Sequence, residues 1–298
     1  MGKASRRRKD LRISHVTDPQ AASARHVHTE QVPFVRRPFE GLPGETDWVA
    51  FREIVPAATA PLTLADGSSA TLATLLPMAW PGLHRADGTV LIAAQTAGSS
   101  GDASRDLAAQ LLATRELEAG QPLQRPPAVT SQTPRLQDLL DPSVPLDVTV
   151  HEGVDFWVEG QELEGEARQS LDQANARVIP TTKLDGTDSA YWSRIGARTH
   201  IRLVLPDDED DATDALARLW AAGAAGLGGP TRILGAFRAG GLLVPVWDLD
   251  PAEDASAYAE PLAGWVRRYR DALAAGEPLT AEERRAKSGF LSRQVTLR

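Results

Sequence analysis

The sequence contains no cysteine and no long apolar run. The first absence excludes disulfide bonds, cysteine-ligated zinc, iron–sulfur clusters and thiol nucleophiles, and it fits a reducing compartment. The second excludes a membrane-spanning helix, which needs roughly 20 apolar residues. The opening stretch MGKASRRRKD is charged and is followed by no apolar run, so we expect no signal peptide. We therefore predict a cytoplasmic protein with no membrane partner.

Lysine is also scarce, with four residues among the 32 basic ones. Together with the abundant alanine, this arginine bias indicates a GC-rich genome. The chain has 298 residues, of which 42% are hydrophobic and 24% are charged. This composition is typical of globular proteins, and the length suits one large domain or two ordinary ones.

Charge is divided unevenly along the chain. Residues 1–12 contain six basic residues and one acidic residue, Asp10, so this segment has a net charge of +5. The basic residues are Lys3, Arg6, Arg7, Arg8, Lys9 and Arg12. Because the whole chain carries −8, the remainder carries −13. An acidic body repels nucleic acid, so any contact with nucleic acid or a ribosome would come from this arm and would be weak and sequence-independent. A solvated tail without a partner is the alternative interpretation.

The apolar periodicity and the proline- and glycine-rich turns divide the chain into four predicted parts. Residues 1–36 have few apolar residues and no sustained period, which indicates a disordered basic arm. Residues 37–120 form a first α+β subdomain, 121–134 (QPLQRPPAVTSQTP) a proline-rich linker, and 135–298 a second α+β subdomain. Hairpins that alternate with single helices favour an antiparallel α+β fold.

The segment RPFEGLPGETDWVAFREIVPAAT, residues 37–59, predicts a structural helix. Trp48, Phe51 and Ile54 recur at helical spacing, acidic residues occupy the first turn, and Pro56 ends the run. Other patterns predict further helices and hairpins, as follows. Helices are expected around Leu107–Leu112, 167–178, 212–220, 261–273 and after Thr280. Hairpins are expected over 190–205, with a four-residue loop 196–199, and over 232–249, with Pro245 on an edge strand. A strand or tight hairpin is expected over 147–158, a strand in RQVTL near the C-terminus, and a turn at Asp87-Gly88 before TVLIAAQ.

The stretch TAGSSGDASRDLAAQLL, residues 96–112, is the first candidate site. A strand that leads through a glycine-rich turn into a helix is able to bind an anion, but the lysine of a P-loop and the glycine spacing of a dinucleotide site are absent. The turn also contains an A-x-S-x-G variant of the nucleophile elbow, with Ser99 as the nucleophile and His151 and His200 downstream as possible bases. The elbow normally lies in a parallel sheet, so a flexible turn that caps a helix is the simpler interpretation.

Metal ligation is the second possibility. His151-Glu152-Gly153-Val154-Asp155 contains ligand types, but on a straight strand His151 and Asp155 would lie about 13 Å apart, and only a reversal at Gly153 would bring them together. We interpret this stretch as a hairpin tip. His26 and His28 lack an obvious third ligand, and the acidic run 206–214 is accounted for as a helix start. We therefore predict no metal site and no cofactor.

Several stretches resemble an uncharacterised actinobacterial family that is catalogued as a domain of unknown function. They are RPFEGLPGETDWVAFREIVPAAT, SATLATLLPMAWPGL, SGDASRDLA, PRLQDLLDP, ANARVIPTTKL with AYWS, and LTAEERRAKSGFLSRQVTLR. Some relatives carry an N-terminal SEC-C-type zinc motif and are labelled SecA-related. The arm of this chain has no cysteine, so it cannot form such a zinc site. The resemblance implies no catalytic residues.

These observations favour a non-enzymatic cytoplasmic binding or scaffold protein, whose basic arm contacts nucleic acid or a ribosome. The alternative is a serine hydrolase that uses Ser99 with His151 or His200 as its base.

Overall fold

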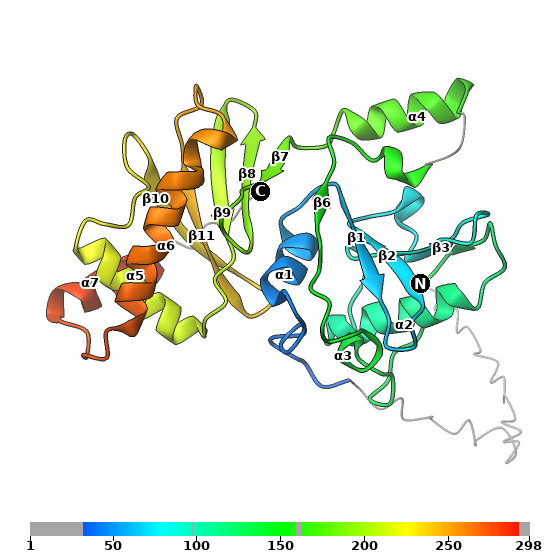
Figure 1. Cartoon of the computed structure of the whole chain (residues 1–298), viewed down its shortest axis with the longest axis horizontal. Coiled ribbons are helices and arrows are strands. Elements are labelled where there is room, and N and C mark those ends of the chain that lie inside the picture. The colour runs from blue at the N-terminus through cyan, green and yellow to red at the C-terminus, as the bar shows by residue number, and fades with distance from the viewer. Residues whose placement is uncertain (1–31, 97, 159–162, 292–298) are drawn as a thin grey trace, which may run out of the picture. The chain divides into compact units, whose positions relative to one another are not determined.

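The structure is a computed structural model that describes residues 32–96, 98–158 and 163–291 (Figure 1). The predicted basic arm falls almost entirely outside these residues, as does the predicted C-terminal strand RQVTL. Helices and two mostly antiparallel sheets make up the described chain, which confirms the α+β prediction. Within the described ranges no helix is both long and apolar enough to cross a bilayer.

The first sheet has the strand order β5-β3-β4-β2-β1-β6, and only β2 and β4 run parallel. Its strands are β1 (Ala58–Thr63), β2 (Ser69–Ala73), β3 (Gly82–His84), β4 (Val90–Ala93), β5 (Pro122–Leu123) and β6 (Thr149–Val150). Side chains alternate between the two faces of a strand. In β1, Ala58, Ala60 and Leu62 are buried on one face, whereas Thr59 and Pro61 lie on the other.

Two helices cover the buried face of this sheet. The first is α1 (Glu45–Glu53), which begins after Gly44 in the left-handed conformation (φ 72°) and has acidic residues in its first turn. The predicted helix is thereby confirmed, and Trp48 and Phe51 point into the core. The second is α2 (Ala103–Arg115), whose Asp102 side chain accepts a hydrogen bond from the Ser104 backbone N–H. The short α3 (Leu136–Leu139) adds Leu136 to the same core.

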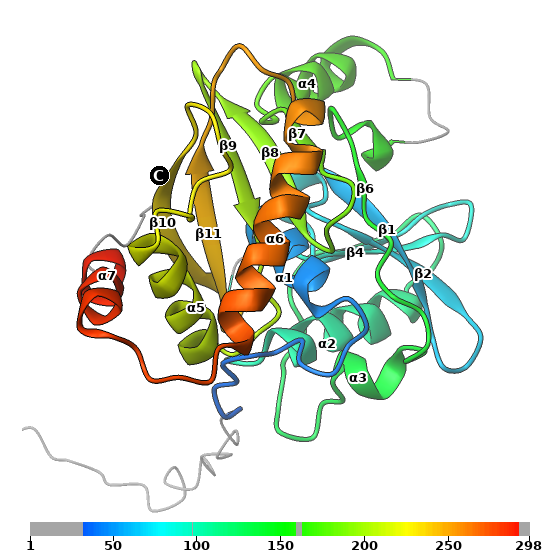
Figure 2. The same cartoon turned by 60° about the vertical axis from the view of Figure 1, so that its left-hand side comes forward.

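The second sheet is antiparallel with the strand order β10-β11-β9-β8-β7, in which the chain passes from β9 over β11's position to the outer strand β10 (Figure 2). Its strands are β7 (Thr181–Lys183), β8 (Ala190–Ile195), β9 (Arg198–Leu203), β10 (Arg232–Ala239) and β11 (Leu242–Asp248). Both predicted hairpins are present. The β8–β9 loop has two residues and not four, because Ile195 pairs with Arg198 and Gly196 adopts the positive φ (60°) that a tight turn requires.

The prediction that Pro245 lies on an edge strand is wrong, since β11 runs between β10 and β9. The pairing of β11 with β9 involves only Val246–Asp248. Pro245 precedes this paired stretch, so its missing N–H costs no hydrogen bond to β9.

Helices cover one face of the second sheet (Figure 2). They are α5 (Glu209–Ala221) and α6 (Ala259–Ala274), which follows the short 3₁₀ turn η3 (Ala255–Tyr258). Trp247 of the sheet and Trp265 of α6 pack edge to face, with ring centroids 4.9 Å apart. A further helix, α7 (Ala281–Leu291), packs on α5. It begins with the predicted capping box, in which Thr280 and Glu283 exchange side chain–backbone hydrogen bonds.

The region 147–158 differs from the predicted long strand or hairpin. Only Thr149–Val150 pairs as a strand, and Asp155–Trp157 forms a 3₁₀ turn (η2). The reason lies in α4 (Gly165–Asn175), because the Asn175 side chain accepts a hydrogen bond from the Val154 backbone N–H and turns the chain away from β1. A third 3₁₀ turn, η1 (Pro77–Ala79), precedes β3.

Residues on both sides of the predicted 121–134 linker share one hydrophobic core. Trp48 and Phe51 of α1 lie in the same cluster as Tyr191, Leu242 and Val244 of the second sheet. The carboxylate of Asp47 in α1 adds polar contacts to this region, since it accepts hydrogen bonds from Lys183 and Tyr191, both at 2.8 Å. The division into two subdomains stays a prediction.

Candidate functional site

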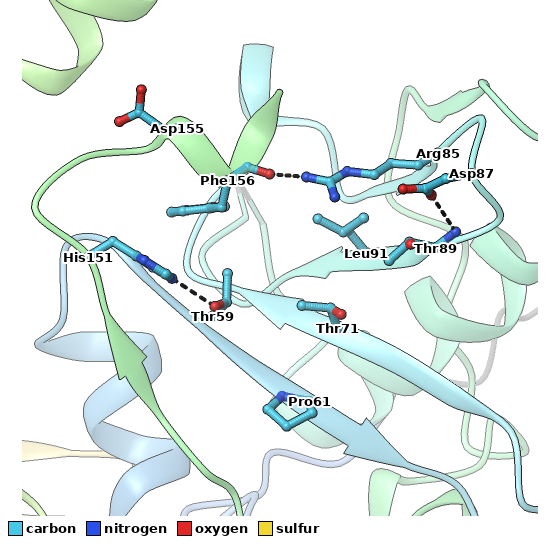
Figure 3. Close-up of a pocket in the computed structure, with 10 residues that line it drawn as sticks. All are labelled: Thr59, Pro61, Thr71, Arg85, Asp87, Thr89, Leu91, His151, Asp155 and Phe156. Carbon is cyan, nitrogen blue, oxygen red and sulfur yellow. Dashed lines mark hydrogen bonds between the residues drawn. The ribbon is translucent and has the colours of Figure 1, made fainter. Parts of the chain in front are cut away.

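A pocket lies on the face of the first sheet opposite α1 and α2 (Figure 3). Its volume is about 840 Å³. We call it the sheet pocket, and it is lined by Thr59, Pro61, Thr71, Arg85, Asp87, Thr89, Leu91, His151, Asp155 and Phe156. Three regions supply these residues: the strands as a floor, the segment 151–156 as one wall, and the β3–β4 turn as the other.

The floor follows from strand register. Pro61 of β1 faces Thr71 of β2, and Thr71 faces Leu91 of β4, so these three side chains form one cross-strand row. Thr59 lies two residues before Pro61 on the same face of β1. The floor therefore alternates between hydroxyl groups and apolar surface.

His151 connects the first wall to the floor. Its Nε2 lies 2.8 Å from Thr59 Oγ1, and its backbone N–H donates to the Ala57 carbonyl. The imidazole ring also packs against Phe156, with centroids 5.1 Å apart. These contacts fix the ring at the edge of the pocket.

The rest of this wall is held by α4 and by the first sheet. Asn175 at the end of α4 binds two groups, accepting from the Val154 N–H at 2.7 Å and donating to Asp155 Oδ2 at 3.0 Å. A Cβ at Gly153 would lie 2.6 Å from Asn175 Oδ1, so a larger residue would force the Asn175 side chain to move. The Trp157 indole N–H donates to the Leu75 carbonyl at 2.8 Å. The wall is thus held by hydrogen bonds within the protein.

The second wall is the turn that Asp87-Gly88 predicts. Gly88 has φ 87°, and the Arg85 N–H donates to the Thr89 carbonyl. Asp87 Oδ1 accepts from the Thr89 N–H at 2.9 Å, and this hydrogen bond holds the pKa of Asp87 below its ordinary value. The buried Arg85 guanidinium donates to the Phe156 carbonyl and so joins the two walls.

The charge inside the sheet pocket is nearly balanced. Arg85 contributes one positive charge, and Asp87 and Asp155 contribute two negative ones. Three threonine hydroxyls and the imidazole of His151 add groups that both donate and accept hydrogen bonds. Among the described residues, no group of three or more His, Asp or Glu side chains is arranged to hold a metal ion. The arrangement suits a polar organic molecule.

Ser99 lies in a different and smaller pocket of about 270 Å³, beside α2. Its hydroxyl donates to Asp106 Oδ2 at 3.2 Å and accepts from the Gly101 N–H at 3.2 Å. The pocket is lined by Thr96, Gly98, Ser99, Ser100, Asp106, Gln110, Pro126, Pro127 and Val129, and none of these is a histidine.

His200 lies on β9 of the second sheet and lines neither of these pockets. It is buried, and burial lowers its pKa although Asp248 Oδ1 is 3.6 Å from Nε2. Ser99, His151 and His200 are therefore placed in three separate surroundings. The predicted nucleic-acid-binding residues, from Lys3 to Arg12, lie outside the described residues.

Sequence reasoning singled out two parts of the sheet pocket, the stretch 151–155 and the Asp87-Gly88 turn. It did not single out Thr59, Thr71 or Arg85. No local pattern marks these residues, because they meet only through the register of β1, β2 and β4 and the return of the chain at β6.

Comparison with known proteins gives one match. A model of the family described as "Family of unknown function (DUF5926)" matches residues 38–298, which confirms the resemblance to an uncharacterised family. No curated protein and no solved structure matches the chain.

Proposed function

The chain belongs to this family of unknown function, and we propose that it is a non-enzymatic binding protein whose sheet pocket holds a small, neutral, polyhydroxylated molecule of sugar size. The observation that carries the proposal is a pocket of about 840 Å³ in which hydroxyl groups alternate with apolar surface. Pockets for small ligands usually span about 300–1,000 Å³, so the volume is suitable.

The lining matches a molecule with carbon faces and many hydroxyls. Pro61, Leu91 and Phe156 offer apolar surface to a carbon skeleton. Thr59, Thr71 and Thr89 offer hydroxyls, each of which is able to donate one hydrogen bond and to accept others. A purely apolar ligand would leave these polar groups without water or a partner, and that would cost binding energy.

The charges disfavour a polyanion. Asp87 and Asp155 are acidic, and the guanidinium of Arg85 already donates to the Phe156 carbonyl. A di- or triphosphate would face two carboxylates with one committed cation, so repulsion would oppose its binding. A neutral ligand avoids this penalty.

Preformed walls support binding. Asn175, Arg85 and Trp157 hold the segment 151–157 through side chain–backbone hydrogen bonds. A site that is ordered before binding loses less conformational entropy when the ligand arrives.

Isothermal titration calorimetry tests the proposal with a panel of neutral mono- and disaccharides and polyols, set against the corresponding sugar phosphates. We expect saturable binding of at least one neutral compound, with the matching phosphate weaker. Thr71→Val keeps the shape of the side chain but removes its hydroxyl, and should weaken binding by roughly three- to tenfold. Thr63→Val is the matched control, because Thr63 lies on the same face of β1 but outside the sheet pocket. A panel without binding, or equal affinity in both variants and the wild type, would refute the proposal.

We also propose that residues 1–36 act as a basic arm that contacts nucleic acid or a ribosome weakly and without sequence preference. The support is the net charge of +5 in residues 1–12 against −13 in the remainder. A pull-down from native lysate, with and without ribonuclease, compares the full chain with a chain lacking residues 1–36. Recovery of RNA by the full chain alone supports the arm's role, and identical, empty eluates remove it. The cytoplasm of an actinobacterium remains the proposed setting, which the cysteine-free, arginine-rich sequence favours.

A serine hydrolase remains the second candidate, supported by the hydrogen bond between Ser99 and Asp106 in the smaller pocket. It requires a base for Ser99, and no residue that lines this pocket is a histidine. The binding function is therefore favoured.

A further inference from the structure

The second sheet contains a buried arginine for which the described chain provides no acidic partner. Arg202 of β9 is 8% exposed, and no hydrogen bond or ion pair joins its side chain to another described residue. Burial lowers its pKa, and no nearby carboxylate opposes this effect. A buried cation without a partner is strongly disfavoured, so Arg202 is an exception that requires an explanation.

The acidic side chains on this face of the sheet are already engaged. Asp47 of α1 accepts hydrogen bonds from Lys183 and Tyr191 through its two oxygens. Asp248 of β11 lies 3.4 Å from Arg232 Nη2 and 3.6 Å from His200 Nε2. Neither carboxylate is thereby available to neutralise Arg202.

Two further buried polar groups lie beside Arg202. His200 is two residues before it on β9 and therefore on the same face of the sheet. Ser193 of β8 is the direct cross-strand neighbour of His200, so their Cβ atoms lie about 5 Å apart. In the described chain, His200 Nδ1, Ser193 Oγ and Arg202 Nε are buried atoms without a hydrogen-bond partner.

Three such atoms at adjacent positions of one sheet face point to a common ligand. A guanidinium fork, an imidazole N–H and a hydroxyl are all able to donate hydrogen bonds to oxygen. We propose that Arg202, His200 and Ser193 form a binding site for a small oxyanion, namely the phosphate or carboxylate group of a metabolite. The anion would neutralise Arg202 and accept the hydrogen bonds that these groups now lack.

The surroundings of the site favour negative charge. Arg198 precedes His200 by two residues on the same face, and Arg232 of β10 is the direct cross-strand neighbour of Asp248 of β11. Both arginines are exposed, and together with Asp248 they give the rim of the buried donors a net charge of +1. None of these residues belongs to the sheet pocket, so the two sites can be tested independently.

Ring ¹⁵N NMR of the histidines tests the proposal. The full chain is titrated with inorganic phosphate, and separately with acetate, while chloride salt keeps the ionic strength constant. We expect the His200 resonances, assigned with His200→Gln, to shift saturably with at least one of the two anions. Arg202→Gln should weaken this binding at least about tenfold, because it removes the charged donor. Arg198→Gln is the control for general electrostatic attraction and should change the affinity less than about threefold.

Arg202→Gln is able to disturb folding, so Ser193→Ala provides a second test of the site. It removes one buried hydroxyl and leaves the charge of the protein unchanged. It should weaken anion binding about threefold or more. Absence of a saturable shift with both anions in the wild type overturns the proposal. So does wild-type affinity in Arg202→Gln, or, where that variant is unfolded, wild-type affinity in Ser193→Ala. If Arg198→Gln weakens anion binding as much as Arg202→Gln does, the binding reflects general electrostatic attraction to surface charge. That result would also overturn the proposal.

Discussion

Thr59 and His151 are separated by 92 positions in the sequence, yet Thr59 Oγ1 and His151 Nε2 are 2.8 Å apart. The contact exists because β6 returns to pair with β1, where Thr59 faces Thr149. It places an imidazole next to a row of strand residues that otherwise carries only hydroxyl and apolar groups. The sheet pocket is built around this contact (Figure 3).

The first prediction concerns the stability of that contact. Thr59→Val removes the hydroxyl and leaves a half-buried imidazole nitrogen without this partner, which should lower the free energy of unfolding by about 1 kcal/mol. Urea denaturation measures the change. Thr63→Val, on the exposed end of the same strand face, should change stability by less than about 0.5 kcal/mol. Equal effects of the two variants would show that the Thr59–His151 hydrogen bond contributes nothing measurable.

A second prediction uses the close approach at Gly153. In Gly153→Ala the added Cβ would lie 2.6 Å from Asn175 Oδ1 and 2.9 Å from Asp155 Oδ2, so the wall of the sheet pocket must shift. We expect weaker binding of any ligand found by calorimetry. The same change at Gly276, where nothing lies within 4 Å, should leave the affinity unaltered. If Gly153→Ala binds as tightly as the wild type, the wall does not position the ligand.

The third prediction concerns pH. Burial raises the pKa of Asp47 despite its hydrogen bonds from Lys183 and Tyr191. The folded state thus holds this proton more tightly than the unfolded state, so the contribution of Asp47 to stability is greatest at or below the ordinary aspartate pKa and falls as pH rises through the raised pKa. In Asp47→Asn this pH dependence should disappear. Urea denaturation between pH 4 and pH 7 compares the two proteins, and an identical slope in both would contradict the expectation.

Asp141 provides a contrast of opposite sign. Hydrogen bonds from the Ser143 hydroxyl and backbone N–H hold its pKa below the ordinary value. Its contribution is therefore present above the ordinary aspartate pKa, about 4, and is lost as pH falls below it. Asp141→Asn should remove a loss of stability in acid, whereas Asp47→Asn should remove a loss toward neutral pH.

The fourth prediction tests the helix at residues 45–53. Trp48 is 3% exposed and stacks on Phe39 with ring centroids 5.6 Å apart. Trp48→Ala should cost about 3–5 kcal/mol of stability, because it opens a large cavity in the core that α1 shares with both sheets. Met78→Ala, at a side chain that is 84% exposed, serves as the control and should change stability by less than about 0.5 kcal/mol. A change below the error of the denaturation curve in Trp48→Ala would contradict this role of the helix.

The fifth prediction concerns Ser99. Its hydroxyl donates to Asp106, and no histidine lines its pocket, so Ser99 lacks the histidine base that commonly activates a serine. A fluorophosphonate probe should leave the protein unlabelled. Labelling that disappears in Ser99→Ala, and persists in a control Ser100→Ala, would establish the hydrolase.

Sequence patterns located the elements whose signals are local. The apolar stripe and stop residue of α1, the capping box at Thr280, and the hairpin turn at Gly196 each depend on residues a few positions apart. Such elements are predictable from sequence because the residues that form the pattern also make the contacts that stabilise the element.

Local sequence patterns did not predict the conformation of segment 147–158 or the sheet pocket. The alternating pattern of DVTVHEGVDFWV predicts a strand, but Asn175, twenty-one positions after Val154, binds the backbone and turns the segment aside. His151 and Asp155 both line the sheet pocket in this turned segment. Long-range side chain–backbone contacts of this kind override local propensity and leave no periodic signal.

The most direct test of the sheet pocket is ring ¹⁵N NMR of His151 during titration with the neutral saccharide and polyol panel. With the His151 resonances assigned by His151→Gln, we expect a saturable shift of these resonances with the compound that calorimetry selects, while those of His200 stay in place. If no neutral compound shifts the His151 resonances saturably, the sheet pocket does not bind the ligand class that its lining indicates.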